Sequence, residues 1–123
     1  MFEDDLYTEL NAKWNAVIIA KPTFTKGEKQ DLGVATKQLH IKDDPLATYA
    51  TQAILTDLMT ERSFLTIQSN STADLLLYLS EIRRIINAYT TDNVTWRVLS
   101  RHIQKLNQLS KLTVTVHRLT DGV

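Results

Sequence analysis

Apolar residues recur at helical spacing along much of the chain, and the clearest case lies at residues 72–89. There, apolar side chains repeat at intervals of three and four positions, which is the period of an amphipathic α-helix. They are Leu75, Tyr78, Leu79, Ile82, Ile85, Ile86 and Tyr89. Ser71 or Thr72 can cap the start of this helix by accepting a backbone N–H bond. We therefore predict a central helix over 72–89 on which the other segments pack.

Two helices are predicted before residue 41. Residues 4–19 fit a first helix, although the stretch 16–24 could also be extended. The apolar face of that helix would consist of Phe2, Leu6, Leu10 and Trp14. Thr25 and Glu28 then match the spacing of a capping box, in which two side chains satisfy the free amides of a helix start. This pair predicts a second helix over 26–40.

The same reasoning predicts two more helices. Asp44 and Pro45 form a helix start, because Pro at the first helical position loses no needed hydrogen bond. That helix would run to about Glu61. A last helix is predicted over 94–109, with Trp96, Leu99, Ile103 and Leu106 on its buried side.

Only two segments alternate between apolar and polar residues in the manner of strands. They are 63–68 and 111–118, and both are rich in residues that favour strands. Paired with each other, or with a second copy of the chain, they would form a small sheet. An unpaired edge at 111–118 would also favour a homodimer. The predicted fold is thus mainly α, a compact bundle of four to five helices around 72–89 with a minor β element.

Composition narrows the class of protein. A chain of 123 residues suits a single domain over 1–123, and three Gly and two Pro favour long regular elements. The absence of Cys excludes disulfides and thiolate metal sites. No apolar run reaches the roughly 20 residues that span a bilayer, and the acidic start does not look like a secretory signal. We expect a cytoplasmic protein without a membrane segment.

Catalytic patterns are not evident in the sequence. The three histidines show no metal-ligand spacing, and no glycine-rich phosphate loop or nucleophile elbow occurs. His40 lies near Asp43 and Asp44, which could suggest a base and its orienting acid. A position at a helix end is the simpler interpretation. We therefore expect no enzyme, no cofactor and no metal site.

Charge is distributed unevenly along the chain. Residues 1–82 carry seven Lys or Arg and twelve Asp or Glu, whereas residues 83–123 carry seven and two, so the net charges are −5 and +5. Such a split can mark a surface for an anionic partner, or two halves that face each other. For the first case, the candidate nucleic-acid contacts are Arg97, Arg101, Gln104, Lys105, Lys111 and Arg118.

The order of a predicted helix, a strand and a turn near the end of the chain resembles a known arrangement. The residues Ser100–Leu106, followed by 111–118 and Asp121-Gly122, are similar to the recognition helix and wing of winged-helix regulators. This resemblance implies DNA binding through the basic helix face. The alternative is an amphipathic helix whose basic face is merely solvated.

A second resemblance suggests protein binding instead. Asp44-Pro45-Leu46 opening a helix, and the apolar stretch Leu75–Ile85, look like helices of bacteriocin immunity proteins. Such bundles act by contact alone. The leading hypothesis is thus a non-enzymatic nucleic-acid-binding protein, and the alternative is a helical adaptor, inhibitor or immunity-type accessory protein of bacterial or phage origin.

Overall fold

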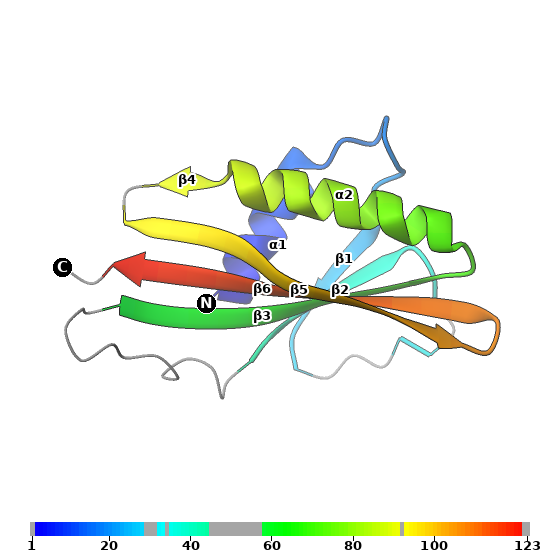
Figure 1. Ribbon diagram of the computed structural model, residues 1–123. Helices are drawn as coiled ribbons and strands as arrows, with labels where there is room; N and C mark the ends of the chain where they lie inside the picture. Colours follow the sequence, from blue (N-terminus) through cyan, green and yellow to red (C-terminus); the bar gives the residue numbers. More distant parts are fainter. Residues whose placement is uncertain (1, 29–31, 34, 45–57, 92, 122–123) are drawn as a thin grey trace.

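The described part of the chain forms one six-stranded sheet with two helices, which corrects the predicted helical bundle (Figure 1). The computed structural model describes residues 2–28, 32–33, 35–44, 58–91 and 93–121. The helices are α1 (Phe2–Lys13) and α2 (Thr72–Ala88). The strands are β1 (Thr23–Lys26), β2 (Gln38–Asp43), β3 (Leu58–Ser69), β4 (Thr90–Thr91), β5 (Val94–Leu106) and β6 (Leu109–Asp121). Neither helix is both long and apolar enough to cross a membrane.

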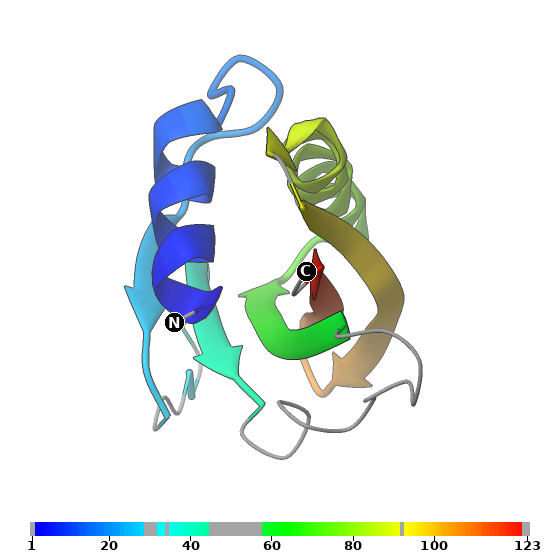
Figure 2. The same cartoon turned by 90° about the vertical axis from the view of Figure 1, so that its left-hand side faces the viewer.

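The strand order in the sheet is β1-β2-β3-β6-β5-β4. The pair β1 and β2 is parallel, and every other neighbouring pair is antiparallel. Both helices lie on the same side of the sheet, α1 beside β1 and β2 and α2 along β5 and β6 (Figure 2). The molecule is therefore a two-layer α+β fold in which the other side of the sheet carries no helix among the described residues.

The predicted central helix is confirmed as α2, which packs on one side of the sheet against β3, β5 and β6. Ser71 caps it, since its hydroxyl accepts a hydrogen bond from the backbone N–H of Asp74 at 3.3 Å. The predicted stripe is buried except for the partly exposed Tyr89. Tyr89 in turn stacks on Trp96 of β5, with the ring centroids 3.6 Å apart. Burial of this stripe against the sheet is the main source of stability that the helix provides.

The two predicted strands are confirmed, and they pair with each other. β3 and β6 are antiparallel neighbours, with Leu65 opposite Val114 and Ile67 opposite Leu112. Because β6 lies between β3 and β5, its backbone is paired on both sides. The predicted free edge at 111–118 is therefore wrong, and so is the basis it gave for a homodimer.

The predicted helix over 94–109 is wrong, because most of this segment is β5. The strand contains a β-bulge between Val98 and Ser100, where one extra residue enters the chain. Trp96 and Ile103 are seven positions apart and would point to opposite faces of a regular strand. The extra residue shifts the alternation, so both side chains face the helices. A spacing of seven is also two helical turns, which explains the misleading pattern.

The predicted helix over 26–40 is also wrong. Thr25 does not cap a helix, because its hydroxyl lies 2.8 Å from Nδ1 of His40 on the neighbouring strand. The backbone then turns at three positions with positive φ, namely Gly27, Gly33 and Lys37. Such conformations interrupt a helix. The chain instead leaves β1 and returns as β2, parallel to it.

The first helix is shorter than the predicted 4–19. Its predicted apolar face is buried, but α1 ends at Lys13 and residues 16–19 form a turn followed by a bend. The side chain of Asn15 accepts a hydrogen bond from the backbone N–H of Val17, which stabilises a turn in place of the helix.

Most of the helix predicted from Pro45 to Glu61 falls on residues 45–57, outside the described part. Its last four residues, 58–61, belong to β3.

A buried carboxylate joins the two helices. Glu81 of α2 is 1% exposed and accepts a hydrogen bond from the backbone N–H of Asn15 at 2.8 Å. Arg84 donates to the same carboxylate from Nε at 2.6 Å, and also donates to the carbonyl oxygen of Lys13 at 2.7 Å. These bonds satisfy the end of α1 and hold it against α2.

We predict that Glu81→Ala lowers the free energy of unfolding by about 2–3 kcal/mol, because it leaves the Asn15 amide without its acceptor and removes the ion pair with Arg84. Urea denaturation measures the change. Arg83→Gln is the matched control, since Arg83 is an exposed neighbour on the same helix, and it should change the stability by less than about 0.5 kcal/mol. Equal effects of the two substitutions would contradict this role of Glu81.

The same contact predicts a pH dependence. The hydrogen bond from Arg84 lowers the pKa of Glu81 below its ordinary value of 4.5, against the opposing effect of burial. The stability that this shift supplies is complete above pH 4.5 and decreases as the pH falls towards the lowered pKa. The difference in stability between the native protein and Glu81→Ala should therefore shrink below pH 4.5. A difference that stays constant into acid would contradict the prediction.

Candidate functional site

The side of the sheet away from the helices carries a polar, positively charged surface, which we call the open face. Residues directly opposite each other in a ladder share a face of the sheet. Since Val114 and Val116 of β6 are buried under the helices, the alternate residues of β6 and their partners point the other way. The open face includes His40, Lys42, Arg62, Phe64, Thr66, Gln68, Arg97, Ser100, His102, Gln104, Lys111, Thr113, Thr115 and His117.

Three of these side chains form a row across adjacent strands, which we call the Arg–His–Arg row. Arg62 of β3 lies opposite His117 of β6, and His117 lies opposite Arg97 of β5. The Nε atom of Arg62 and the Nε2 atom of His117 are buried and have no hydrogen-bond partner in the described part of the chain. Burial lowers the pKa of His117 below 6.5, and the charges of Arg62 and Arg97 lower it further.

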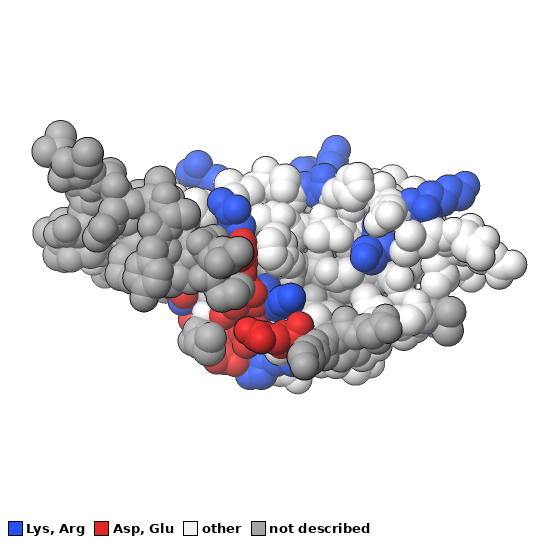
Figure 3. Space-filling view, turned by 90° about the horizontal axis from the view of Figure 1, so that it is seen from below, with Lys and Arg blue, Asp and Glu red and all other residues white. Residues whose placement is uncertain are grey.

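The two lysines of the open face lie outside this row, Lys42 on β2 and Lys111 further along β6. Lys42 is opposite Phe64, and Lys111 is opposite both Gln68 and Gln104. Successive residues on one face of a strand are about 6.8 Å apart, so the charges are spread along the sheet. The view of this side shows Lys and Arg scattered over a surface that is otherwise mostly uncharged, with the visible acids gathered near one border (Figure 3).

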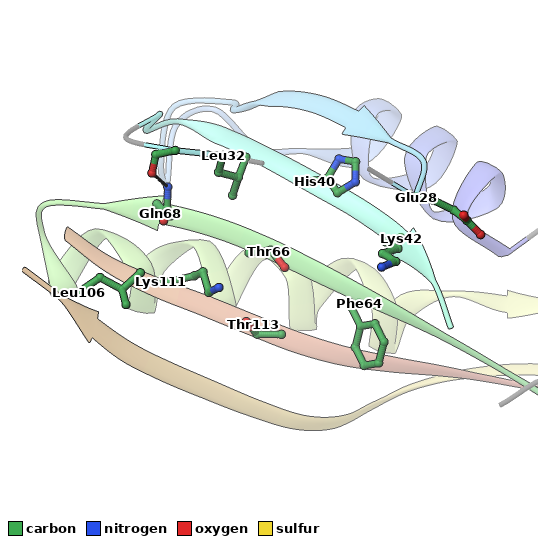
Figure 4. A pocket seen from close by; sticks show the side chains of 11 residues that line it. Glu28, Leu32, His40, Lys42, Phe64, Thr66, Gln68, Leu106, Lys111 and Thr113 are labelled. Carbon is green, nitrogen blue, oxygen red and sulfur yellow. Dashed lines mark hydrogen bonds between the residues drawn. The ribbon is translucent and has the colours of Figure 1, made fainter. Parts of the chain in front are cut away.

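A hollow of about 530 Å³ opens on this face, between the strands and the loop that follows β1 (Figure 4). Lys42, Lys111, Phe64, Thr66 and Thr113 lie along its strand side, and Glu28 lies on its loop side. The loop is fixed by Gln68, whose Nε2 donates to the carbonyl oxygens of Gly33 at 3.0 Å and Ala35 at 3.2 Å. The hollow is thus lined by lysine amines, threonine hydroxyls, one carboxylate, the Gln68 amide, the Phe64 ring, the His40 imidazole and two leucines.

The six residues predicted as nucleic-acid contacts do not share one face. Arg97, Gln104 and Lys111 lie on the open face. Arg101 is opposite the buried Val114, and Lys105 is opposite the buried Ser110, so both belong to the helix side of β5 although their side chains are exposed. The predicted helical stripe does not exist here, because the segment is a strand.

Arg118 also lies on the helix side of the sheet, where acids pair with it. Its guanidinium donates to Glu61 from Nε at 3.0 Å and from Nη2 at 2.7 Å, and it forms an ion pair with Asp5 of α1. Its carbon Cζ lies 4.7 Å from the centre of the Phe2 ring. Arg118 therefore connects α1 to the sheet, and its charge is neutralised within the chain.

The sequence reasoning missed Lys42, Arg62 and His117. The alternation that predicted the strands at 63–68 and 111–118 already contained the signal for two of them. In such a strand every second residue shares a face, so His117 falls with Lys111 and away from Arg118. Lys42 could not be placed this way, because it lay between the helix predicted over 26–40 and the helix predicted from Pro45.

His40 is not arranged as a catalytic base. It is 6% exposed, and its two ring nitrogens are engaged by the Thr25 hydroxyl at 2.8 Å and by the carbonyl oxygen of Gly27 at 2.7 Å. With the Nε2 atom donating to this carbonyl oxygen, Nδ1 accepts from Thr25. The ring thus links β1, β2 and the loop between them.

The comparisons with known proteins concern the fold. The structure is similar to a chain in the virion of a native gene transfer agent particle, with a TM-score of 0.62 and 9% sequence identity. The alignment covers 98% of this chain and 94% of that chain. No protein-family model and no curated protein sequence matches the chain. At this identity the likeness establishes a shared fold.

We predict that Arg97→Gln raises the pKa of His117, because it removes one of the two positive charges that disfavour the imidazolium. Histidine ring signals followed by NMR through a pH titration measure the change. Arg101→Gln, on the opposite side of the same strand, is the control and should leave the pKa of His117 within about 0.2 units. An unchanged pKa in Arg97→Gln would show that the two side chains do not interact.

Proposed function

We propose that this protein is a structural component of a phage-like particle and acts by contact with other components. The observation that carries the proposal is the likeness to the gene transfer agent virion chain over 98% of this chain and 94% of that one. Because the alignment extends over nearly all of both chains, the two proteins share a whole fold. If they shared only a small motif, most of at least one chain would lie outside the alignment. The proposal retains the phage origin of the adaptor hypothesis and replaces its helical contact surface.

The exposed surfaces of the sheet suit such a role. β4 pairs only with Val94 and Thr95, so the outer edge of β5 from Trp96 to Leu106 has no strand partner among the described residues. Unpaired strand edges are ready sites for another chain. The bulge and the exposed Arg97, Arg101 and Lys105 are features that keep such an edge from pairing indiscriminately.

The test is whether the protein is part of particles made by the cells that encode it. We expect a chromosomally tagged copy to sediment with nuclease-treated particles in a density gradient, at a constant ratio to the other particle proteins. Purified tagged protein added to finished particles is the control for adsorption, and it should stay at the top of the gradient. A tagged protein found only in the particle-free fractions during particle production would refute the proposal.

Contact with nucleic acid is a second candidate, favoured by the cations of the open face. Lys42, Arg62, Arg97 and Lys111 have no ion-pair partner in the described part of the structure. The partly exposed ring of Phe64 lies among them. Cations spaced along a groove with an aromatic ring between them suit a single strand, whose phosphates need neutralising and whose bases stack.

For this candidate we predict binding to a short oligothymidine that weakens steeply with salt. Each phosphate contact releases counterions, so Lys111→Gln should reduce the slope of log affinity against log salt by about 0.7. Lys105→Gln, a change of the same charge on the helix side, should leave the slope unaltered. Fluorescence anisotropy at several salt concentrations measures both. If the oligothymidine does not bind at low salt, nucleic-acid binding is refuted, whereas the proposed particle role is not affected.

A further inference from the structure

We propose that the Arg–His–Arg row of Arg62, His117 and Arg97 is a binding site for one phosphate group. The site lies on three adjacent strands, β3, β6 and β5, and is distinct from the hollow beside Lys42 and Lys111. It deepens the nucleic-acid candidate by naming where a phosphate would bind. It does not depend on the particle role.

The row concentrates charge of one sign without internal compensation. Arg62 and Arg97 lie on the two strands that flank β6, and each is opposite His117, so their backbones are two strand spacings, or about 9.6 Å, apart and their charges repel each other across His117. The open-face neighbours in the next row are Phe64, Thr115 and Ser100, none of which is acidic. An anion bound between the two guanidinium groups would remove this repulsion.

The row also contains polar atoms that need a partner. The Nε atom of Arg62 and the Nε2 atom of His117 are buried without a hydrogen bond among the described residues. A buried polar group without a partner destabilises the folded state, and more so when it is charged. Both atoms belong to adjacent residues of the same row, so one ligand with several acceptor oxygens could serve both.

Charge matching favours phosphate over a carboxylate. The two arginines carry two fixed positive charges, and a phosphate group near neutral pH carries between one and two negative charges. A single carboxylate would leave one arginine uncompensated, and so would one phosphodiester of a nucleic-acid backbone, so the charge match is fullest for inorganic phosphate or a terminal phosphate group. Phosphate also offers more acceptor oxygens, enough for two guanidinium groups and an imidazole N–H together. His117 would gain a proton more readily with the anion present.

The experiment is an NMR titration of the intact chain with inorganic phosphate, with potassium chloride at the same ionic strength as the reference. We expect saturable shifts of the ring signals of His117 and a rise in its pKa on saturation. Arg97→Gln should weaken phosphate binding at least tenfold, because it removes one of the two arginines. Arg101→Gln is the matched control and should bind within twofold of the native protein, since its side chain belongs to the other face of β5.

His117→Gln supplies a second variant that keeps a polar side chain in the row, and it should weaken binding severalfold while the fold, followed by circular dichroism, is unchanged. Shifts that chloride reproduces, or equal losses in Arg97→Gln and Arg101→Gln, would overturn the proposal. So would saturable binding of acetate or polyglutamate in place of phosphate, which would assign the row to acidic protein segments.

Binding of oligothymidine, measured in parallel with phosphate binding, distinguishes this inference from the nucleic-acid candidate. Phosphate binding that survives while the oligothymidine fails to bind would support a small-anion site and remove the nucleic-acid candidate. Oligothymidine binding that depends on Lys111 but is unaffected by Arg97→Gln, together with no phosphate binding, would overturn the inference and keep the candidate. Binding of both probes with the same sensitivity to Arg97→Gln would support the site as a contact for the nucleic-acid backbone.

Discussion

The antiparallel register between β3 and β6 is the constraint on which the rest of this structure depends. It pairs twelve residues of each strand, from Leu58 opposite Asp121 to Ser69 opposite Ser110. Because side chains alternate strictly, a slip of one residue would exchange the two faces of a strand. The register therefore places Leu65, Ile67, Leu112 and Val114 under α2 and, as a necessary consequence, the cationic and hydroxyl side chains on the open face.

The charged residues that are unevenly distributed along the chain are arranged differently on the two sides of the sheet. On the helix side, acids of the first half meet cations of the second half, as Asp5 and Glu61 meet Arg118. On the open face, Arg62 and Arg97 have no such partner in the described part of the chain. Part of the charge split thus forms ion pairs within the chain, and part is left without an ion-pair partner among the described residues.

β5 combines the features that most affect contacts with other molecules. Its bulge between Val98 and Ser100 brings Trp96 and Ile103 to the same core while most of its outer edge has no strand partner among the described residues. The arginine at 97 faces the open side and the arginine at 101 faces the helix side. β5 thereby contributes side chains to the core and to the proposed phosphate site, and its outer edge is largely without a strand partner among the described residues.

The sequence by itself determined those elements whose hydrophobic pattern has one interpretation. The stripe of α2 with its Ser71 cap, the apolar face of α1, and the alternation at 63–68 and 111–118 could all be predicted, because local periodicity and burial agree there. Only the tertiary structure decided β5, since a bulge gave a strand the spacing of a helix, and β1 and β2, since Thr25 bonds to His40 across strands. The tertiary structure alone also decided which residues lie together on the open face. Which cations are neutralised and which stay free depends on neighbours distant in the sequence, and pairing across strands is a property of the fold.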